Sequence, residues 1–408
     1  MLSNAIRAII LCAAVPLMLA AFPSVVWAQR KVVSKPATQK AGSAKSAISQ
    51  DLQDVYSQTG LAVSADDYTK IARFCADVIQ SPQRSKADRD YAKNLLAWSL
   101  NRRGEVRGDE ASQLVEEGKI AQAEKLDQQA AEDFATAIQY APNNWRTVHN
   151  YAISLAMQGK YALAIEQFSQ VVSLNDQYAN AFFNRGELYF ETKKYSLAVD
   201  DYSQAIALVP SDAQYFNSRG HSQFMLSRYE PALEDYRQAV KLGADSAVYH
   251  TDLADALQFL GQWDEAARQY REAIALNANY GRAYKNAAWL MATCPDAKYR
   301  DTELALSAAR KAHAMDGDGD FRTLDTLAAA MAATGDTRQA VKVAEQAMQT
   351  APVADRPELM ARMKLYQQGR AYVQPRVPVK IVDESTAEPA EPSVVTASNS
   401  KRPLPRQR

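Results

Sequence analysis

A period of 34 residues runs through the middle of this chain and limits its fold more than any other sequence feature. Small residues, aromatic residues and leucines return at the same place in four consecutive segments. The clearest columns are Ala164, Ala198, Ala232 and Ala266; Phe168, Tyr202, Tyr236 and Tyr270; and Leu174, Leu208, Leu242 and Leu276. Self-similarity at this spacing is typical of repeat folds in which each unit stacks on its neighbours.

Each unit is expected to form two helices, as the segment 179–212 illustrates. Apolar and small residues follow helical spacing in both halves of the segment. The two stripes consist of Phe182, Gly186 and Tyr189 in the first half, and of Ala198, Tyr202 and Ala205 in the second. Small side chains at Gly186 and Ala198 allow the two helices to approach closely, and Pro210 ends the second helix.

These columns resemble the tetratricopeptide repeat (TPR) family. The family pattern has a small residue at position 8, Ala at 20, an aromatic residue at 24, Ala at 27 and often Pro at 32. In 179–212 those positions hold Gly186, Ala198, Tyr202, Ala205 and Pro210. The resemblance implies an all-α TPR helix-hairpin solenoid, wound as a right-handed superhelix, with helical caps and disordered termini. Residues 288–301 and 365–369 resemble an exported bacterial TPR subfamily, which implies the fold but no defined activity.

The chain divides into nine predicted segments. They are a signal peptide at 1–28, a flexible basic leader at 29–46, an N-terminal helical cap at 47–86, a TPR-like unit with a helical insertion at 87–144, four 34-residue TPRs at 145–280, a TPR-like unit with an extended turn at 281–320, a TPR at 321–354, a C-terminal capping helix at 355–374 and a disordered, proline-rich tail at 375–408. The insertion, 105–125, itself favours two helices that break at Gly118. Asp355 and Glu358 form a D-x-x-E capping signature.

The N-terminus has the three parts of a secretory signal peptide. Arg7 precedes an apolar run at 8–22, and small residues surround Trp27, so we expect cleavage after Ala28 and a periplasmic or secreted protein. A single membrane anchor is the alternative, although the run is shorter than a membrane helix needs. No later segment has that length, so no integral membrane segment is expected after cleavage.

Charge and cysteine content narrow the function classes further. Lys plus Arg and Asp plus Glu both number 47, and such a balance does not favour binding to nucleic acid. Cys75 and Cys294 remain after cleavage. Because they lie far apart in a stacked array, two free, buried thiols are favoured over a disulfide.

The sequence contains no recognisable catalytic or cofactor motif. Its four histidines show no metal-binding spacing, and both common phosphate-binding glycine motifs are missing. The run from Asp316 to Asp320 resembles the start of a calcium loop. Phe321 and Leu327 stand where that loop needs glycine and glutamate, so a turn is favoured over a weak cation site. We therefore expect no enzyme activity, no metal and no cofactor.

The TPR resemblance implies a concave groove lined by the first helix of each hairpin. An asparagine row at position 6 is suited to hold an extended peptide backbone, similar to the asparagine ladder of O-linked N-acetylglucosamine transferases. Local hydrogen bonding without a ligand is the alternative. The candidate groove residues are Asn150, Phe183, Asn184, Phe190, Asn217, Asp252, Arg282, Lys285 and Asn286. The predicted function is a scaffold or adaptor for a protein or extended peptide; the alternative is a self-assembling envelope scaffold, and self-association is possible in either case.

Overall fold

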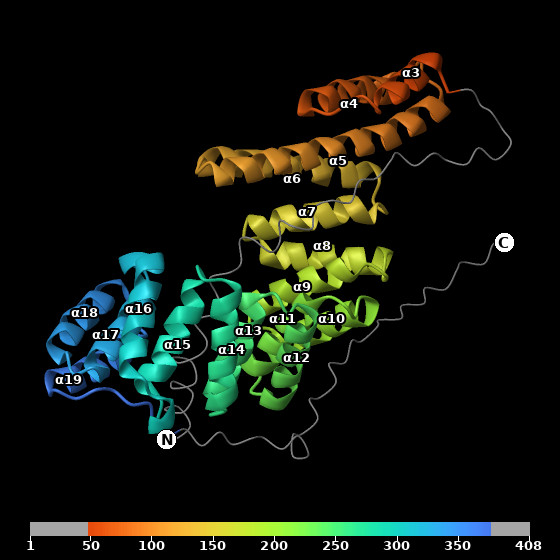
Figure 1. Cartoon of the computed structure of the whole chain (residues 1–408). Helices are drawn as coiled ribbons and strands as arrows, with labels where there is room; N and C mark the ends of the chain where they lie inside the picture. The colour runs from red at the N-terminus through yellow and green to blue at the C-terminus, as the bar shows by residue number, and fades with distance from the viewer. Residues whose placement is uncertain (1–47, 377–408) are drawn as a thin grey trace, which may run out of the picture. The chain divides into compact units, whose positions relative to one another are not determined.

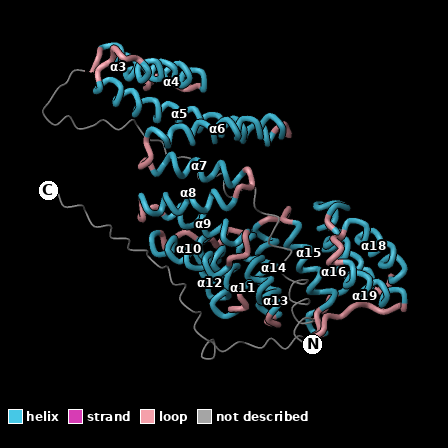
Figure 2. The backbone as a smooth tube through the Cα atoms, turned by 180° about the vertical axis from the view of Figure 1, so that it is seen from behind, coloured by secondary structure: helices cyan, strands magenta, loops and turns pink. Residues whose placement is uncertain are grey.

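The computed structural model describes residues 48–376, apart from the side chain of Asp318. The predicted signal peptide and leader, and the predicted tail beyond residue 376, lie outside the described residues. Residues 48–376 form seventeen α-helices and no strand (Figure 1, Figure 2). The predicted all-α helical solenoid is confirmed. None of these helices is both long and apolar enough to cross a bilayer.

The helices follow one another in hairpins, and consecutive hairpins pack together. The helices are α3 (Gln50–Gln58), α4 (Ala65–Gln80), α5 (Lys86–Glu116), α6 (Ile120–Tyr140), α7 (Trp145–Met157), α8 (Tyr161–Leu174), α9 (Ala179–Glu191), α10 (Tyr195–Leu208), α11 (Ala213–Met225), α12 (Tyr229–Leu242), α13 (Ala247–Phe259), α14 (Trp263–Leu276), α15 (Gly281–Thr293), α16 (Thr302–Asp316), α17 (Phe321–Ala333), α18 (Thr337–Thr350) and α19 (Arg356–Gln367). From α7 onward we call the odd-numbered helices up to α17 the first helices, and their partners up to α18 the second helices. Short 3₁₀ turns, η3 (Ala297–Tyr299) and η4 (Gly317–Gly319), flank α16.

The repeat columns form the contact between the two helices of each hairpin. The alanines at position 20, such as Ala198 and Ala232, are fully buried, and so are the rings at position 24, such as Tyr202 and Tyr236. A β-carbon added at Gly186 would lie 2.9 Å from the Tyr202 ring. A small residue at position 8 is therefore needed so that the ring can pack directly on the backbone of the first helix.

As predicted, the insertion 105–125 is helical and breaks at Gly118, and its two halves lengthen α5 and α6. α5 has 31 residues and α6 has 21, and Gly118 joins them with φ 74°. A β-carbon at Gly104 would lie 2.6 Å from the Phe134 ring, so the two helices are in close contact there. Asp133 of α6 also accepts hydrogen bonds from Arg103 at 2.9 Å and Arg107 at 2.6 Å.

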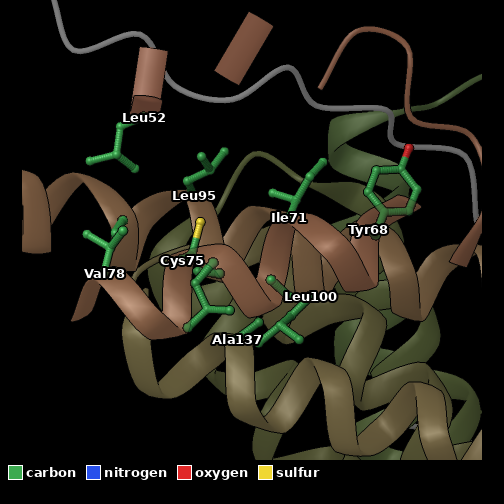
Figure 3. Close-up of a cluster of buried hydrophobic side chains, with 12 residues drawn as sticks. Leu52, Tyr68, Ile71, Cys75, Val78, Leu95, Leu100 and Ala137 are labelled. Atoms are coloured by element: carbon green, nitrogen blue, oxygen red, sulfur yellow. The ribbon is translucent and has the colours of Figure 1, made fainter. Parts of the chain in front are cut away.

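The N-terminal helices α3 and α4 cover the start of α5 with an apolar core. Figure 3 shows part of this cluster around Cys75, to which α3, α4, α5 and α6 contribute. Both Cys75 and Cys294 are free and buried, as predicted. Burial raises the pKa of the Cys75 thiol to about 12, so the thiol stays protonated at neutral pH.

The predicted C-terminal capping helix, 355–374, is too long. α19 ends at Gln367, and Gly369 follows with φ 73°, in the left-handed region that ends helices. Residues 370–376 are not helical. The helical pattern therefore stops where glycine allows the backbone to reverse.

The predicted capping signature at the start of α19 is also wrong. The Asp355 side chain caps nothing, because its φ of −88° and ψ of −20° are already those of a helix, whereas a capping side chain needs an extended residue. A turn in which the Asp355 N–H donates to the Pro352 carbonyl at 3.0 Å imposes this conformation. Glu358 instead lies 3.5 Å from Arg362.

The turn between the helices of a hairpin places position 15 in the left-handed region. Glycine occupies this position at Gly159, Gly261 and Gly335. Lys193 and Ser227 occupy it in the α9–α10 and α11–α12 hairpins, with φ of 59° and 61°. A side chain with a β-carbon is disfavoured in this conformation, so these two turns are less stable than their glycine counterparts.

We expect Lys193→Gly to stabilise the chain. The substitution removes a left-handed clash worth about 1–2 kcal/mol, while the freedom of glycine in the unfolded chain offsets about half of that. The free energy of unfolding should rise by roughly 0.5–1 kcal/mol in urea titrations. The matched reverse change, Gly159→Lys, should lower it. A Lys193→Gly variant that unfolds at lower urea than the parent chain contradicts this reasoning.

Candidate functional site

Hydrogen bonds link neighbouring first helices at positions 5 and 6 of the repeat. The Asn184 amide donates to Nε2 of His149 at 3.3 Å, and the Asn217 amide donates to Oδ2 of Asp252 at 2.8 Å. Both bonds join residues 35 apart, so position 5 of one unit meets position 6 of the next. We call the surface formed by positions 2, 5, 6, 9, 12 and 13 of the first helices the first-helix face.

A charged cluster lies at the centre of this face. Arg282 Nη2 lies 2.7 Å from Asp252 Oδ1 and 2.6 Å from Asp255 Oδ2. His221 Nε2 lies 3.3 Å from Asp252 Oδ2, and the Asn286 amide donates to Asp255 Oδ1 at 2.7 Å. We call these five residues, together with Asn217, the Arg282 cluster. It joins α11, α13 and α15, the first helices of three consecutive units.

The cluster holds the Asp252 carboxylate in the charged form. Burial alone would raise the pKa of Asp252, but the charges of Arg282 and His221 outweigh burial and hold that pKa well below its usual range. The same two carboxylates, Asp252 and Asp255, raise the pKa of Arg282 well above its usual value, against the effect of burial. The ion pairs are therefore intact across the neutral range.

The other predicted groove residues also have partners within the chain. Asn150 donates to Glu105 of α5 at 3.0 Å, and Lys285 lies 2.7 Å from Asp320. Phe183 is 1% exposed and packs between Tyr202 and Tyr215, with ring centroids 5.7 and 4.9 Å away.

Phe190 is half-buried and packs on Tyr195, with ring centroids 5.4 Å apart. The structure thus brings Asn217, Asp252, Arg282 and Asn286 together, and it leaves Asn150, Phe183 and Phe190 outside that cluster. For Asn184, Asn217 and Asn286 the geometry matches the alternative interpretation, since their amides already donate to side chains of the chain.

The calcium-like run forms the turn that the sequence favours. Asp320 precedes α17 and accepts from the Arg322 N–H at 3.1 Å, as a helix cap does. Its other oxygen binds Lys285 and accepts from the Thr323 hydroxyl at 2.9 Å. The Asp320 carboxylate is therefore engaged in capping and in the ion pair.

A group of three hydrogen-bonded residues, an arginine, an aspartate and a serine, occurs in two consecutive units and was missed by the sequence analysis. We call this group the clamp. Arg185 binds Asp201 with two bonds of 2.7 Å and donates to Ser169 at 3.0 Å. One unit further on, Arg219 binds Asp235 at 2.9 and 2.7 Å and donates to Ser203 at 3.1 Å. All three columns repeat at 34 residues, so the period was a sufficient signal for this clamp. Each clamp joins one first helix to its own second helix and to the preceding one.

Stacked hairpins with a small residue facing a buried ring define the chain as a tandem helical-repeat protein. Residues 150–213 and 183–247 match the family model described as tetratricopeptide repeat. This match confirms, for these residues, the tetratricopeptide repeats predicted from the repeat columns. No curated protein matches the sequence.

Several solved TPR structures are similar to part of the chain. YrrB, a TPR protein with an unusual peptide-binding site, is 23% identical; the match covers 48% of this chain and 97% of YrrB, with a TM-score of 0.39. MamA from Desulfovibrio magneticus RS-1 is 19% identical, over 43% of this chain and 96% of MamA, with a TM-score of 0.38. A TPR protein from Parabacteroides merdae ATCC 43184 is 17% identical, over 65% of this chain and 98% of its own, with a TM-score of 0.48.

Proposed function

We propose that this chain is an exported scaffold that binds a protein partner through an extended peptide segment on its first-helix face. The observation that supports the proposal is a row of half-buried polar side chains along consecutive first helices. The row consists of Ser218 and His221 of α11, Asp255 of α13 and Arg282 of α15. The side chains of His221, Arg282 and Asp255 are 18%, 17% and 11% exposed, and their neighbours in the Arg282 cluster hold them in place.

This arrangement suits a peptide backbone better than a highly charged ligand. The row presents donors and acceptors, as a peptide with alternating N–H and C=O groups requires. Two carboxylates beside one guanidinium repel a polyanion such as nucleic acid. Because the side chains are already fixed by their ion pairs, little further entropy is lost when a ligand binds.

The proposal predicts that bulk added at Ser218 blocks binding. Ser218 is half-buried on α11, beside Glu187 of α9, and an arginine there would project over the face. Ser218→Arg should weaken capture of the partner from envelope extract by about tenfold or more, equivalent to roughly 1.4 kcal/mol. Photo-crosslinkers placed at residue 218 should label the same partner.

Ser196→Arg is the matched control. Ser196 is exposed on the second helix α10, and the substitution adds the same charge and volume on another face. This variant should retain full binding, and a crosslinker at residue 196 should leave the partner unlabelled. Binding that is lost in Ser196→Arg and kept in Ser218→Arg would assign the partner to the second helices and refute the proposal.

Export rests on the predicted signal peptide, which lies outside the described residues. N-terminal sequencing of the chain recovered from the envelope should begin at Gln29, directly after Ala28. A chain that keeps Met1 and stays in the cytoplasm would refute export. It would leave the binding proposal intact.

Self-assembly is a second candidate function, favoured by exposed apolar residues near both ends of the described array. Leu61 and Val63, between α3 and α4, are 80% and 78% exposed, and Val353, between α18 and α19, is 77% exposed. Apolar groups on opposite ends suit head-to-tail association of copies. An apparent mass on gel filtration that grows with protein concentration would support this function, and a constant monomeric mass would exclude it.

A further inference from the structure

Residues 370–376, which we call the C-terminal segment, leave the last helix and return toward α15. The Gly369 N–H donates to Tyr366 O and the Arg370 N–H to Leu365 O, each at 2.9 Å. With Gly369 in the left-handed region, these two bonds reverse the chain after α19. Both overall views show the segment after α19 leading back to the end of α15 (Figure 1, Figure 2).

The C-terminal segment lies on the first-helix face in the manner of an extended peptide. Tyr372 and Gln374 are half-buried, while the residues between and beside them are exposed. This alternation has the period of an extended strand, in which every second side chain faces the same surface. The Gln374 N–H donates to the carbonyl of Thr293 at 2.8 Å, which belongs to the last turn of α15 and has no partner within the helix.

An aromatic and cationic contact fixes the Tyr372 side chain. Its ring centroid lies 5.9 Å from that of Trp289, which occupies position 9 of α15. The Arg362 guanidinium of α19 lies 5.4 Å from the Trp289 centroid and 5.6 Å from the Tyr372 centroid. Arg362 is itself held by Asp325 of α17 through contacts of 3.0 and 2.8 Å. Three helices thus build the surface on which the tyrosine lies.

The contact is small compared with the packing of a helix in this array. One main-chain hydrogen bond and one ring contact join the segment to α15, and Tyr372 adds its contact with Arg362 and packing beside Tyr366. The two residues beside Tyr372, Ala371 and Val373, remain exposed. A segment held by so few interactions opens locally far more often than the helices unfold.

We propose that Trp289, Arg362, Asp325 and the end of α15 form a binding site for an extended peptide with an aromatic side chain, and that the C-terminal segment occupies it in cis. The segment is then an internal competitor: a partner that carries the same chemistry must displace it. This inference rests on the proposed function, because it specifies the class of peptide that the first-helix face accepts.

The test uses a labelled synthetic peptide with the sequence of residues 369–376 and the full-length chain. In the double variant Tyr372→Ala, Gln374→Pro, the internal segment lacks both its ring and the N–H that Thr293 accepts. The peptide should bind this variant at least tenfold more tightly than it binds the parent chain. Adding Trp289→Ala to the double variant should abolish that binding. Val373→Ala, which changes an exposed side chain of the segment, should behave as the parent chain does.

Two outcomes overturn the inference. Equal binding to the double variant and the parent chain means that the segment does not occupy the site. No binding to a double variant that melts with the parent chain means that the site does not accept the peptide in trans. If the double variant unfolds, hydrogen exchange in the parent chain decides the matter: fast exchange of the Gln374 N–H supports a displaceable segment, and protection equal to that of α15 refutes it.

These results are independent of the crosslinking experiment at residue 218. Failure of the peptide to bind refutes the site at Trp289, whereas failure of the partner to crosslink refutes the proposed function. The peptide is the chain's own, so its binding does not require that an envelope partner exist.

Discussion

Replacing Arg282 with Met should destabilise the chain by about 3–5 kcal/mol, the usual result of removing one partner from a buried ion pair. Asp252 is 1% exposed and Asp255 is 11% exposed by side chain, and Arg282 contacts both. Without the guanidinium, both carboxylates would lose the cation that they share, and Asp252 would keep its contacts with His221 and Asn217. One of them must then take up a proton, or the helices α13 and α15 must separate.

Arg237→Met is the control for this prediction. The Arg237 side chain is 48% exposed and lies 3.0 Å from Glu265, so it forms a surface ion pair between two second helices. Loss of this ion pair should lower the free energy of unfolding by less than about 1 kcal/mol. The denaturation midpoints of both variants in urea give the comparison. If the two substitutions shift the midpoint equally, the Arg282 cluster contributes no more than a surface pair, and the burial argument is wrong.

Replacing the carboxylates as well should restore part of the lost stability. In the triple variant Arg282→Met, Asp252→Asn, Asp255→Asn, no unpaired charge remains and the amides still donate and accept hydrogen bonds. This variant should unfold at higher urea than Arg282→Met alone. A triple variant no more stable than Arg282→Met would show that the loss arises from packing rather than from charge.

The second large effect concerns pH and comes from His149. Burial lowers the pKa of His149 from 6.5 to about 4. Between these values the unfolded chain binds a proton that the folded chain does not, so stability is complete above about pH 6.5 and falls as the pH drops toward 4. From pH 7 to pH 5 the loss from this residue is about 2 kcal/mol.

His149→Phe should remove this part of the acid sensitivity. Phe183 shows that position 5 accepts a phenylalanine, and at residue 149 the new ring would meet Phe168 and Tyr178, which already pack on the imidazole at 5.6 and 5.1 Å. Unfolding in urea at pH 7 and pH 5 measures the difference. Buried carboxyls with raised pKa values, such as Glu187, act in the opposite direction, so the two chains must be compared at each pH.

Asn184→Ala distinguishes the effect of His149 protonation from the effect of the hydrogen bond between Asn184 and His149. It removes the amide that donates to His149 but keeps the imidazole, so the pH dependence should persist although stability falls at every pH. If His149→Phe loses as much stability on acidification as the parent chain, another group is responsible.

The core of the repeat could be predicted from the sequence because the buried positions recur at the same 34-residue period as the residue types. Alanine at position 20 and a ring at position 24 meet within one hairpin, so their contact depends only on local helix geometry. The end of α19 is harder to predict. Apolar spacing continues past Gln367, and only Gly369 signals that the helix ends.

The candidate site could be predicted only in outline. The first-helix positions identify Asn184, Asn217 and Asp252 as groove residues, yet whether their side chains face a ligand or each other depends on the angle between hairpins. That angle brings position 5 of one unit to position 6 of the next, at a separation of 35 residues. The return of Tyr372 to Trp289 has no periodic signal at all, because it involves a segment outside the repeats.

The bonds between positions 5 and 6 have a consequence for how this array evolves. Each junction has its own chemistry: histidine with asparagine at His149 and Asn184, and amide with carboxylate at Asn217 and Asp252. Duplicating the unit 213–246 in tandem would place a copy of Ser218, in the position of Asp252, opposite Asn217. The units are thus not interchangeable modules. Gain or loss of a whole repeat would therefore change which side chains meet at the new junction.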